Sequence, residues 1–148
     1  MTPDDLDSAE LVSIAIQKTL SEIPGLGTLA PGGVRNGTRR QGAEVPVIVH
    51  AIGPGGYDSP GYGGVDSVEY INVDIKVIAS EKLQANVGVI LRAIHVALQG
   101  KPLDLGGGYL SHMQTLSLRR IPQYAETAGS TTYLHRGRTY QVTVSHTP

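Results

Sequence analysis

The residues of this chain best suited to metal binding or acid–base chemistry are five histidines, at positions 50, 95, 112, 135 and 146. No two of them stand two or four residues apart, the spacings that place two imidazoles on one face of a strand or helix. The spacing therefore favours partly buried or surface histidines over a metal site. His50 and His112 both fall on expected strands, so the sequence leaves open a catalytic or metal-binding pair formed by folding.

Motifs for nucleophilic, phosphate-binding or redox chemistry are missing from the sequence. It has no cysteine, no G-x-S-x-G turn and no G-x-x-x-x-G-K-[ST] loop. Residues 25–30 fit the spelling of a dinucleotide-binding loop, but they follow an expected helix, whereas that loop must follow a strand. The acids Asp4, Asp5, Asp7 and Glu10 are typical of a helix N-terminus, where the helix dipole stabilises carboxylates. We therefore expect no enzymatic activity and no cofactor.

Charge is unevenly distributed although the net charge is only −1. Residues 1–10 contain four acids and no base, whereas residues 31–43 contain three arginines and no acid. Three interpretations of the arginines remain open: a solvated face, a nucleic-acid contact, and complementary surfaces on neighbouring copies of the chain. Nucleic-acid modules usually add stacking aromatics or a net basic charge, and this chain has neither in the right place.

Contacts between unlike surfaces of neighbouring copies run head to tail and close into a ring when the rotation permits. In such a ring, acids of residues 53–74 and of the first helix would face arginines of an adjacent copy. The residues expected at these subunit or partner contacts are Arg35, Arg39, Arg40, Tyr57, Asp58, Tyr62, Asp66, Arg119, Arg120, Arg136 and Arg138.

The length of 148 residues predicts one domain, with an aliphatic core because the only aromatic residues are seven tyrosines. Long flexible loops are expected at about residues 31–43 and 53–67, which are rich in glycine. The first twenty residues lack the basic start and apolar run of a signal peptide, and no apolar run approaches the eighteen residues of a membrane span.

Hydrophobic periodicity predicts two amphipathic helices and four strands. The first helix is expected from a cap at Thr2 to a stop at Pro24–Gly25, and the second from a cap at Ser80 to about Gln99. The strands are expected at residues 44–52, 68–79, 109–121 and 133–145, the first starting late because Pro46 cannot donate to a ladder. This order, α-β-β-α-β-β, predicts an α+β fold in which both helices pack on one face of a mainly antiparallel four-stranded sheet.

Most of the chain resembles a known family. The resemblance rests on element order and a diffuse residue pattern: Ile16, Leu20 and Ile23-Pro24-Gly25 in the opening helix, the strand segments 45–49, 69–77 and 138–144, and a helix from Leu83 to Leu98 closed by Gly100. Over residues 6–145 these features resemble the tail terminator, or tail completion, proteins of long-tailed bacteriophages. The segment 53–67 is longer than the corresponding hairpin of the family.

The resemblance implies a structural virion protein without catalysis, found in the tail or neck region of the virion and assembled in the host cytoplasm. It implies a hexameric ring that caps the tail tube, ends its polymerisation and offers a joining surface to the head. The implied partners are other copies of the chain, the tail tube protein and a head–tail connector or neck protein, with passive contact to passing DNA and no membrane. Residues 31–42 and 53–67 are the expected docking elements.

Three alternatives remain open at this point. One is a neck or head-completion (connector) protein, positioned one ring nearer the head. Another is a small-ligand-binding protein or an enzyme that uses the neighbourhood of His50 and His112. The third is a DNA-binding accessory protein that uses the arginines of residues 31–43, and its binding to DNA would fall steeply with salt.

Overall fold

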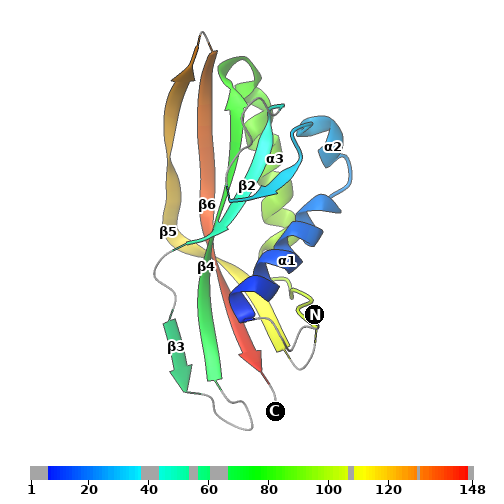
Figure 1. Cartoon of the computed structure of the whole chain (residues 1–148), viewed down its shortest axis with the longest axis vertical. Helices are drawn as coiled ribbons and strands as arrows, with labels where there is room; N and C mark the ends of the chain where they lie inside the picture. Colours follow the sequence, from blue (N-terminus) through cyan, green and yellow to red (C-terminus); the bar gives the residue numbers. More distant parts are fainter. Residues whose placement is uncertain are drawn as a thin grey trace.

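A long, twisted sheet forms one layer of the molecule, and helices cover one of its faces (Figure 1). The computed structural model describes residues 7–37, 44–53, 57–60, 67–106, 109–129 and 131–146. The helices are α1 (Ser8–Ser21), α2 (Leu26–Leu29) and α3 (Gln84–Leu98), with a 3₁₀ turn η2 (Glu81–Leu83) before α3. The strands are β1 (Val34–Asn36), β2 (Val47–Ile52), β3 (Tyr57–Pro60), β4 (Ser67–Ser80), β5 (Tyr109–Ala128) and β6 (Thr131–His146).

The strand order confirms the predicted fold class. The sheet runs β1-β2-β4-β6-β5, and its four principal strands β2, β4, β6 and β5 pair antiparallel. β5 and β6 form a long hairpin that turns at Gly129, where the backbone φ is +65°. β2 begins at Val47, directly after Pro46, as the missing N–H of proline requires. The protein is therefore an α+β fold with a mainly antiparallel sheet.

Two short strands were not expected from the sequence, and each lies in a segment predicted to be a loop. β1 pairs with β2 in parallel, Val34 opposite Ile48, so these two strands do not form a hairpin. β3 pairs antiparallel with the beginning of β4, Tyr57 opposite Tyr70. Both strands add backbone hydrogen bonds at the margin of the sheet, which hydrophobic alternation cannot reveal in segments so rich in glycine.

The ends of the helices differ from the prediction. α1 begins at Ser8, because the side chain of Asp7 accepts a hydrogen bond from the backbone N–H of Ala9 at 2.7 Å and caps the helix. Thr2, the expected cap, lies outside the described residues. β4 extends to Ser80, so that residue ends a strand and the 3₁₀ turn η2 precedes α3. The prediction of both helix caps was therefore wrong by several residues.

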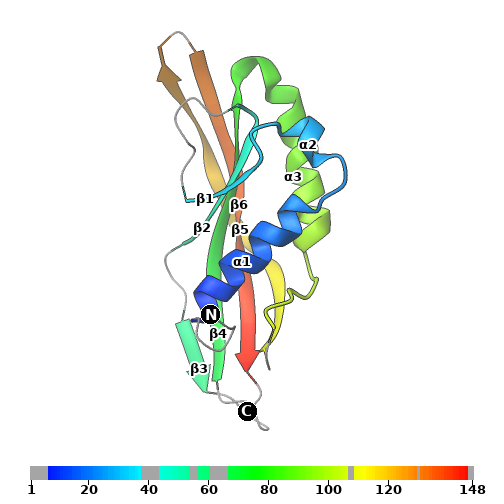
Figure 2. The same cartoon turned by 45° about the vertical axis from the view of Figure 1, so that its right-hand side comes forward.

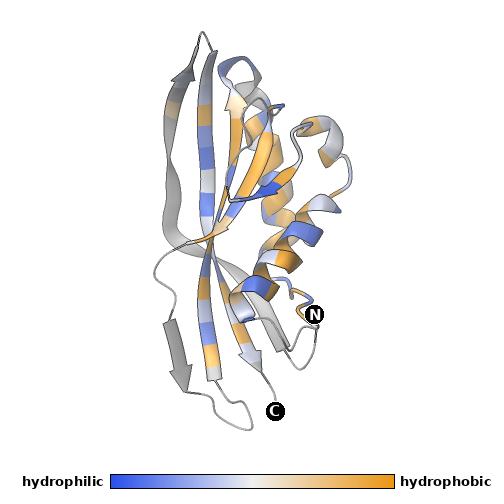
Figure 3. Ribbon diagram, viewed as in Figure 1, coloured by the Kyte–Doolittle hydropathy of each residue, from blue (hydrophilic) through white to orange (hydrophobic). Residues whose placement is uncertain are grey.

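The main core lies between the helices and the sheet, where apolar residues gather (Figure 3). Val12, Ile16 and Leu20 of α1 and Ile90 and Ile94 of α3 are fully or almost fully buried. They pack against the sheet face expected from alternation, which includes Ile71, Val73, Ile75, Val77, Tyr140, Val142 and Val144. Burial of each such side chain contributes about 1.5–3 kcal/mol, so this interface holds the helices in place.

The other face of the sheet is not uniformly solvated, although the polar residues Asn72, Asp74 and Lys76, which alternate with the apolar residues of β4, predict a solvated face. Val47, Val49 and Ile78 form a second buried cluster there, with Val45 and Tyr133 packed against it. Asn72 and Thr139 on this face are also buried. Alternation predicted the direction of the side chains correctly, but exposure depends on what covers the face.

Candidate functional site

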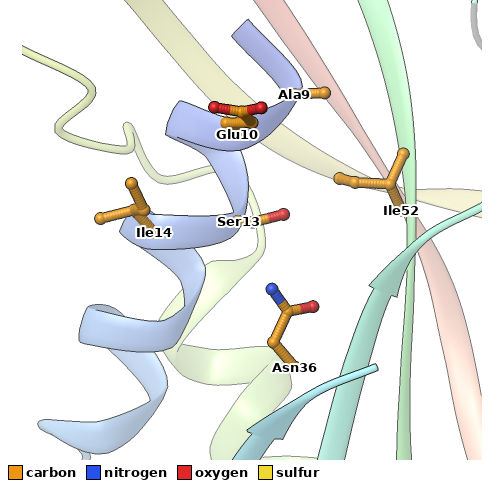
Figure 4. Close-up of a pocket in the computed structure, with 6 residues that line it drawn as sticks. All are labelled: Ala9, Glu10, Ser13, Ile14, Asn36 and Ile52. Atoms are coloured by element: carbon orange, nitrogen blue, oxygen red, sulfur yellow. The ribbon is translucent and has the colours of Figure 1, made fainter. Parts of the chain in front are cut away.

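An open groove of about 340 Å³ lies between α1 and the ends of β1 and β2 (Figure 4). It is lined by Ala9, Glu10, Ser13 and Ile14 of α1, by Asn36 of β1 and by Ile52 of β2. We call this set the α1 groove. Because β1 and β2 are parallel, their last residues reach the same end of the sheet, opposite the first turns of α1.

The start of α1 is held in place by two polar contacts. Besides the Asp7 cap, the Ser8 hydroxyl donates to Oε2 of Glu69 on β4 at 2.6 Å. Ile14 and Ile52 in the groove are 56% and 41% exposed, and Glu10 is exposed as well. The groove therefore presents aliphatic surface and one carboxylate to solvent.

A second exposed apolar surface lies on α3. Val89 and Val96 are 54% and 53% exposed, two turns apart on the side of the helix opposite the buried Ile90 and Ile94. Arg92, also exposed, stands between them. We call Val89, Arg92 and Val96 the α3 ridge.

The amino-acid sequence contains a signal for both surfaces. Ile14 is out of phase with the apolar stripe of α1, and Val89 and Val96 are out of phase with that of α3. An aliphatic residue on the polar side of an amphipathic helix adds nothing to the core, so two or more of them on one exposed surface indicate a candidate contact surface.

The structure separates the arginines expected at partner contacts. Arg35 is exposed on β1, at one edge of the sheet. Arg119 and Arg120 lie on β5, at the opposite edge, where Arg120 stands opposite Arg138 of β6. Arg136 and Arg138 are half-buried on β6. These described arginines therefore do not form a single basic surface.

The remaining residues expected at partner contacts are only partly described. Tyr57 and Asp58 lie on β3, with Asp58 opposite Glu69 in the ladder. Arg39, Arg40, Tyr62 and Asp66 lie outside the described residues. Contact of any of these residues with a partner stays a prediction.

Arg138 participates in a polar cluster inside the fold. Its guanidinium donates to Nδ1 of His95 on α3 at 3.2 Å, and the Tyr140 hydroxyl lies 3.2 Å from the same nitrogen. Burial, followed by the positive charges of Arg138 and Arg92, lowers the pKa of His95. A neutral imidazole can accept at Nδ1, so the cluster connects α3 to β6 in the uncharged state of His95.

His50 connects α1 to the sheet. Its side chain is 1% exposed, and its Nε2 donates to Oε1 of Gln17 at 2.7 Å. Gln17 in turn donates from Nε2 to the carbonyl oxygen of Val34 on β1, at 3.0 Å. Burial lowers the pKa of His50, which keeps this imidazole neutral at pH 7. The position and contacts of His50 are those of a residue that holds the helix against two strands.

The structure does not bring His50 and His112 together. β4 and β6 lie between their strands, β2 and β5, so three strand spacings of about 4.8 Å, roughly 14 Å, separate the two backbones across the sheet. Their registers also differ: His50 lies opposite Ile75, which pairs with Arg138, whereas His112 lies opposite Thr143. A catalytic or metal-binding pair of these two histidines is therefore not formed.

The part of the chain that the structure describes contains no group of three or more histidine, aspartate or glutamate side chains arranged to hold a metal ion. No helix within it has both the length and the apolar character needed to cross a membrane.

Comparison with known proteins finds a likeness in fold but not in sequence. No known protein family matches the chain, and no curated protein is recognisably similar to it in sequence. Among solved structures, its fold is similar to that of a chain described as "Virion of native gene transfer agent (GTA) particle", with a TM-score of 0.52 and 18% identity. The likeness covers 88% of this chain and 92% of that chain. This chain therefore shares its fold, over most of its length, with a component of a virion.

Proposed function

We propose that this chain is a structural virion protein, related to those of bacteriophages, that forms a hexameric ring at the end of the tail tube. The ring ends polymerisation of the tube and provides the surface to which the head joins. The observation that carries this proposal is the likeness to a chain of a virion particle, which extends over nearly the whole of both chains. The element order that resembles tail terminator proteins supports the same assignment.

The surface of the chain is consistent with assembly into a ring. Single exposed aliphatic residues are common on soluble proteins, but here they gather on two separate surfaces, the α1 groove and the α3 ridge. A ring needs two unlike contact surfaces on each subunit, because every copy presents one surface to each neighbour. Its proposed partners are other copies of itself, the tail tube protein and a head–tail connector, in the tail or neck region of the virion.

The proposal is tested by measuring the mass of the purified chain by light scattering over a concentration series. The same samples are imaged in negative stain, with and without tail tubes assembled from the tube protein of the same virion. We expect rings, or a monomer that becomes a ring at tube ends, and tubes that stop elongating when the chain is added. A monomer that neither binds tubes nor limits their length would contradict the proposal.

Two further binding measurements, with isolated heads and with duplex DNA, would assign the alternatives. Binding to isolated heads but not to tubes would identify a neck or connector protein. Binding to duplex DNA that falls steeply between low and physiological salt would identify a DNA-binding protein, because each neutralised phosphate releases counterions.

A further inference from the structure

We propose that neighbouring subunits meet by insertion of the α3 ridge of one copy into the α1 groove of the next. This inference rests on the proposed ring and specifies the contact that would build it. The occupant of the groove is thus a second copy of this chain. The contact is head to tail, so each subunit uses its ridge toward one neighbour and its groove toward the other.

The two surfaces match in polarity and form. The ridge presents two valines, Val89 and Val96, about half of whose surface is exposed, with Arg92 between them on the same side of α3. The groove is a hollow whose exposed aliphatic residues are Ile14 and Ile52. Removing both sets from water is favourable, and the centre of a protein contact is typically apolar in this way.

The charges of the two surfaces are complementary. Arg92 stands between the two valines of the ridge, and α3 contains no acidic residue. Glu10 lines the groove, and Asp7 is exposed one turn before it. A ridge that enters the groove therefore brings a guanidinium to a carboxylate. Contact of two ridges would place Arg92 against Arg92, which like-charge repulsion disfavours.

The positions of the surfaces allow a head-to-tail contact. α1 packs over β1 and β2, whereas α3 packs over β4 and β6. In Figure 2, β1 and β2 lie on one side of α1 and α3 lies on the other. The ridge points away from the core on the solvent side of α3, and the groove lies between α1 and the ends of β1 and β2. The two surfaces are thus on different sides of the subunit, as a closed ring requires.

Charge reversal provides the decisive test. Arg92→Glu and Glu10→Arg should each reduce ring formation, measured by light scattering and negative stain, by about tenfold or more, because each places like charges in contact. An equimolar mixture of the two variants should restore rings. In a ring in which the two variants alternate, every contact joins opposite charges, either in the native arrangement or with the two charges exchanged. A hexamer can alternate in this way because it has an even number of subunits.

Lys18→Glu is the matched control. Lys18 is exposed on α1 and does not line the groove, and its reversal changes net charge as Arg92→Glu does. It should form rings as the unchanged chain does. Thermal unfolding of every variant is compared, because Glu10 also stabilises the first turn of α1.

Cross-linking tests the contact without altering charge. The chain has no cysteine, so Ile14→Cys and Val89→Cys introduce the only thiols. With a bismaleimide linker, a chain carrying both substitutions should give a ladder of products that ends at the ring. Val89→Cys alone should give no linked product, whereas linked dimers of that variant would show that ridges contact each other and would overturn the inference.

The outcomes separate this inference from the proposed function. Suppose that the unchanged chain forms rings. If both charge variants form rings equally well, or if mixing the variants does not restore rings, the ridge–groove contact is wrong but the proposed ring is not contradicted. If the unchanged chain forms no ring with or without tubes, both proposals fail.

Discussion

Nε2 of His50 lies 2.7 Å from Oε1 of Gln17, and this hydrogen bond joins a fully buried strand residue to the middle of α1. The amide nitrogen of the same glutamine reaches the carbonyl oxygen of Val34 on β1. One side chain thus connects α1 to both parallel strands that end at the α1 groove. His50, which the sequence offered as a candidate catalytic or metal-binding residue, instead positions the wall of the α1 groove.

Gln17→Ala should destabilise the protein by about 1–3 kcal/mol, because it leaves the buried Nε2–H of His50 and the Val34 carbonyl without this partner. The free energy of unfolding from urea titration measures the loss. Lys18→Ala is the neighbouring exposed control and should change that free energy by less than about 0.5 kcal/mol. Equal effects of the two substitutions would show that the Gln17 contacts contribute nothing to stability.

The free energy of unfolding should decrease as the pH falls below 6.5, which is the pKa of histidine in an unfolded chain. The pKa values of His50 and His95 are both lowered by burial, so below 6.5 the unfolded state binds more protons than the folded state. The stabilisation is fully present above pH 6.5 and is lost as the pH drops through the folded-state values.

Urea titrations between about pH 8 and about pH 5.5 test this dependence while most carboxylates stay ionised. His95→Gln cannot gain a proton in this range and should show a shallower decline than the unchanged chain. A decline of unchanged steepness in His95→Gln would contradict the contribution of the His95, Arg138 and Tyr140 cluster.

Gly137→Ala should destabilise the protein by about 1–3 kcal/mol, because a Cβ at this buried position of β6 would overlap the backbone of Ile75 and Lys76 on β4. Gly88→Ala makes a matched comparison. No atom lies within 4 Å of the Cβ it would introduce on the exposed side of α3, and alanine should stabilise the helix by about 0.5–1 kcal/mol. Shifts of opposite sign in the midpoint of thermal unfolding are therefore expected.

Replacing residues 55–64 by a short Gly-Ser linker should spare folding and impair head–tail joining. The replaced segment contains β3, whose paired neighbour is the beginning of β4, so its removal leaves the described core residues unchanged. Circular dichroism measures folding, and the fraction of joined particles in electron micrographs measures function. Normal joining with the replaced segment would remove residues 53–67 from the docking elements.

Local hydrophobic periodicity was enough to predict the two long helices and the four principal strands. The spacing of Val12, Ile16 and Leu20 predicted the buried face of α1, and alternation over residues 71–77 predicted which side chains of β4 enter the core. These predictions were correct because an amphipathic element must turn its apolar face inward, whatever its partner. The α+β fold class followed from the same order of elements.

Which elements lie next to one another depends on long-range packing and strand pairing. Sequence placed His50 and His112 on strands, but the strand order put β4 and β6 between them. The sequence suggested that arginines from several segments share partner contacts. Strand pairing instead places Arg35 and Arg120 at opposite edges of the sheet, and Arg138 donates a hydrogen bond to His95. The strands β1 and β3 exist through pairing with β2 and β4, and local propensity does not encode such pairing.

The α3 ridge and the α1 groove also combine a feature that is visible in the sequence with one that tertiary packing sets. Val89 and Ile14 are visible in the sequence as aliphatic residues out of phase with their helices. Whether such residues are covered depends on the packing of segments far apart in the chain, and folding left both at the surface. Periodicity is a property of neighbouring residues, whereas exposure and complementarity depend on long-range packing, so only the tertiary structure could turn these residues into two candidate contact surfaces.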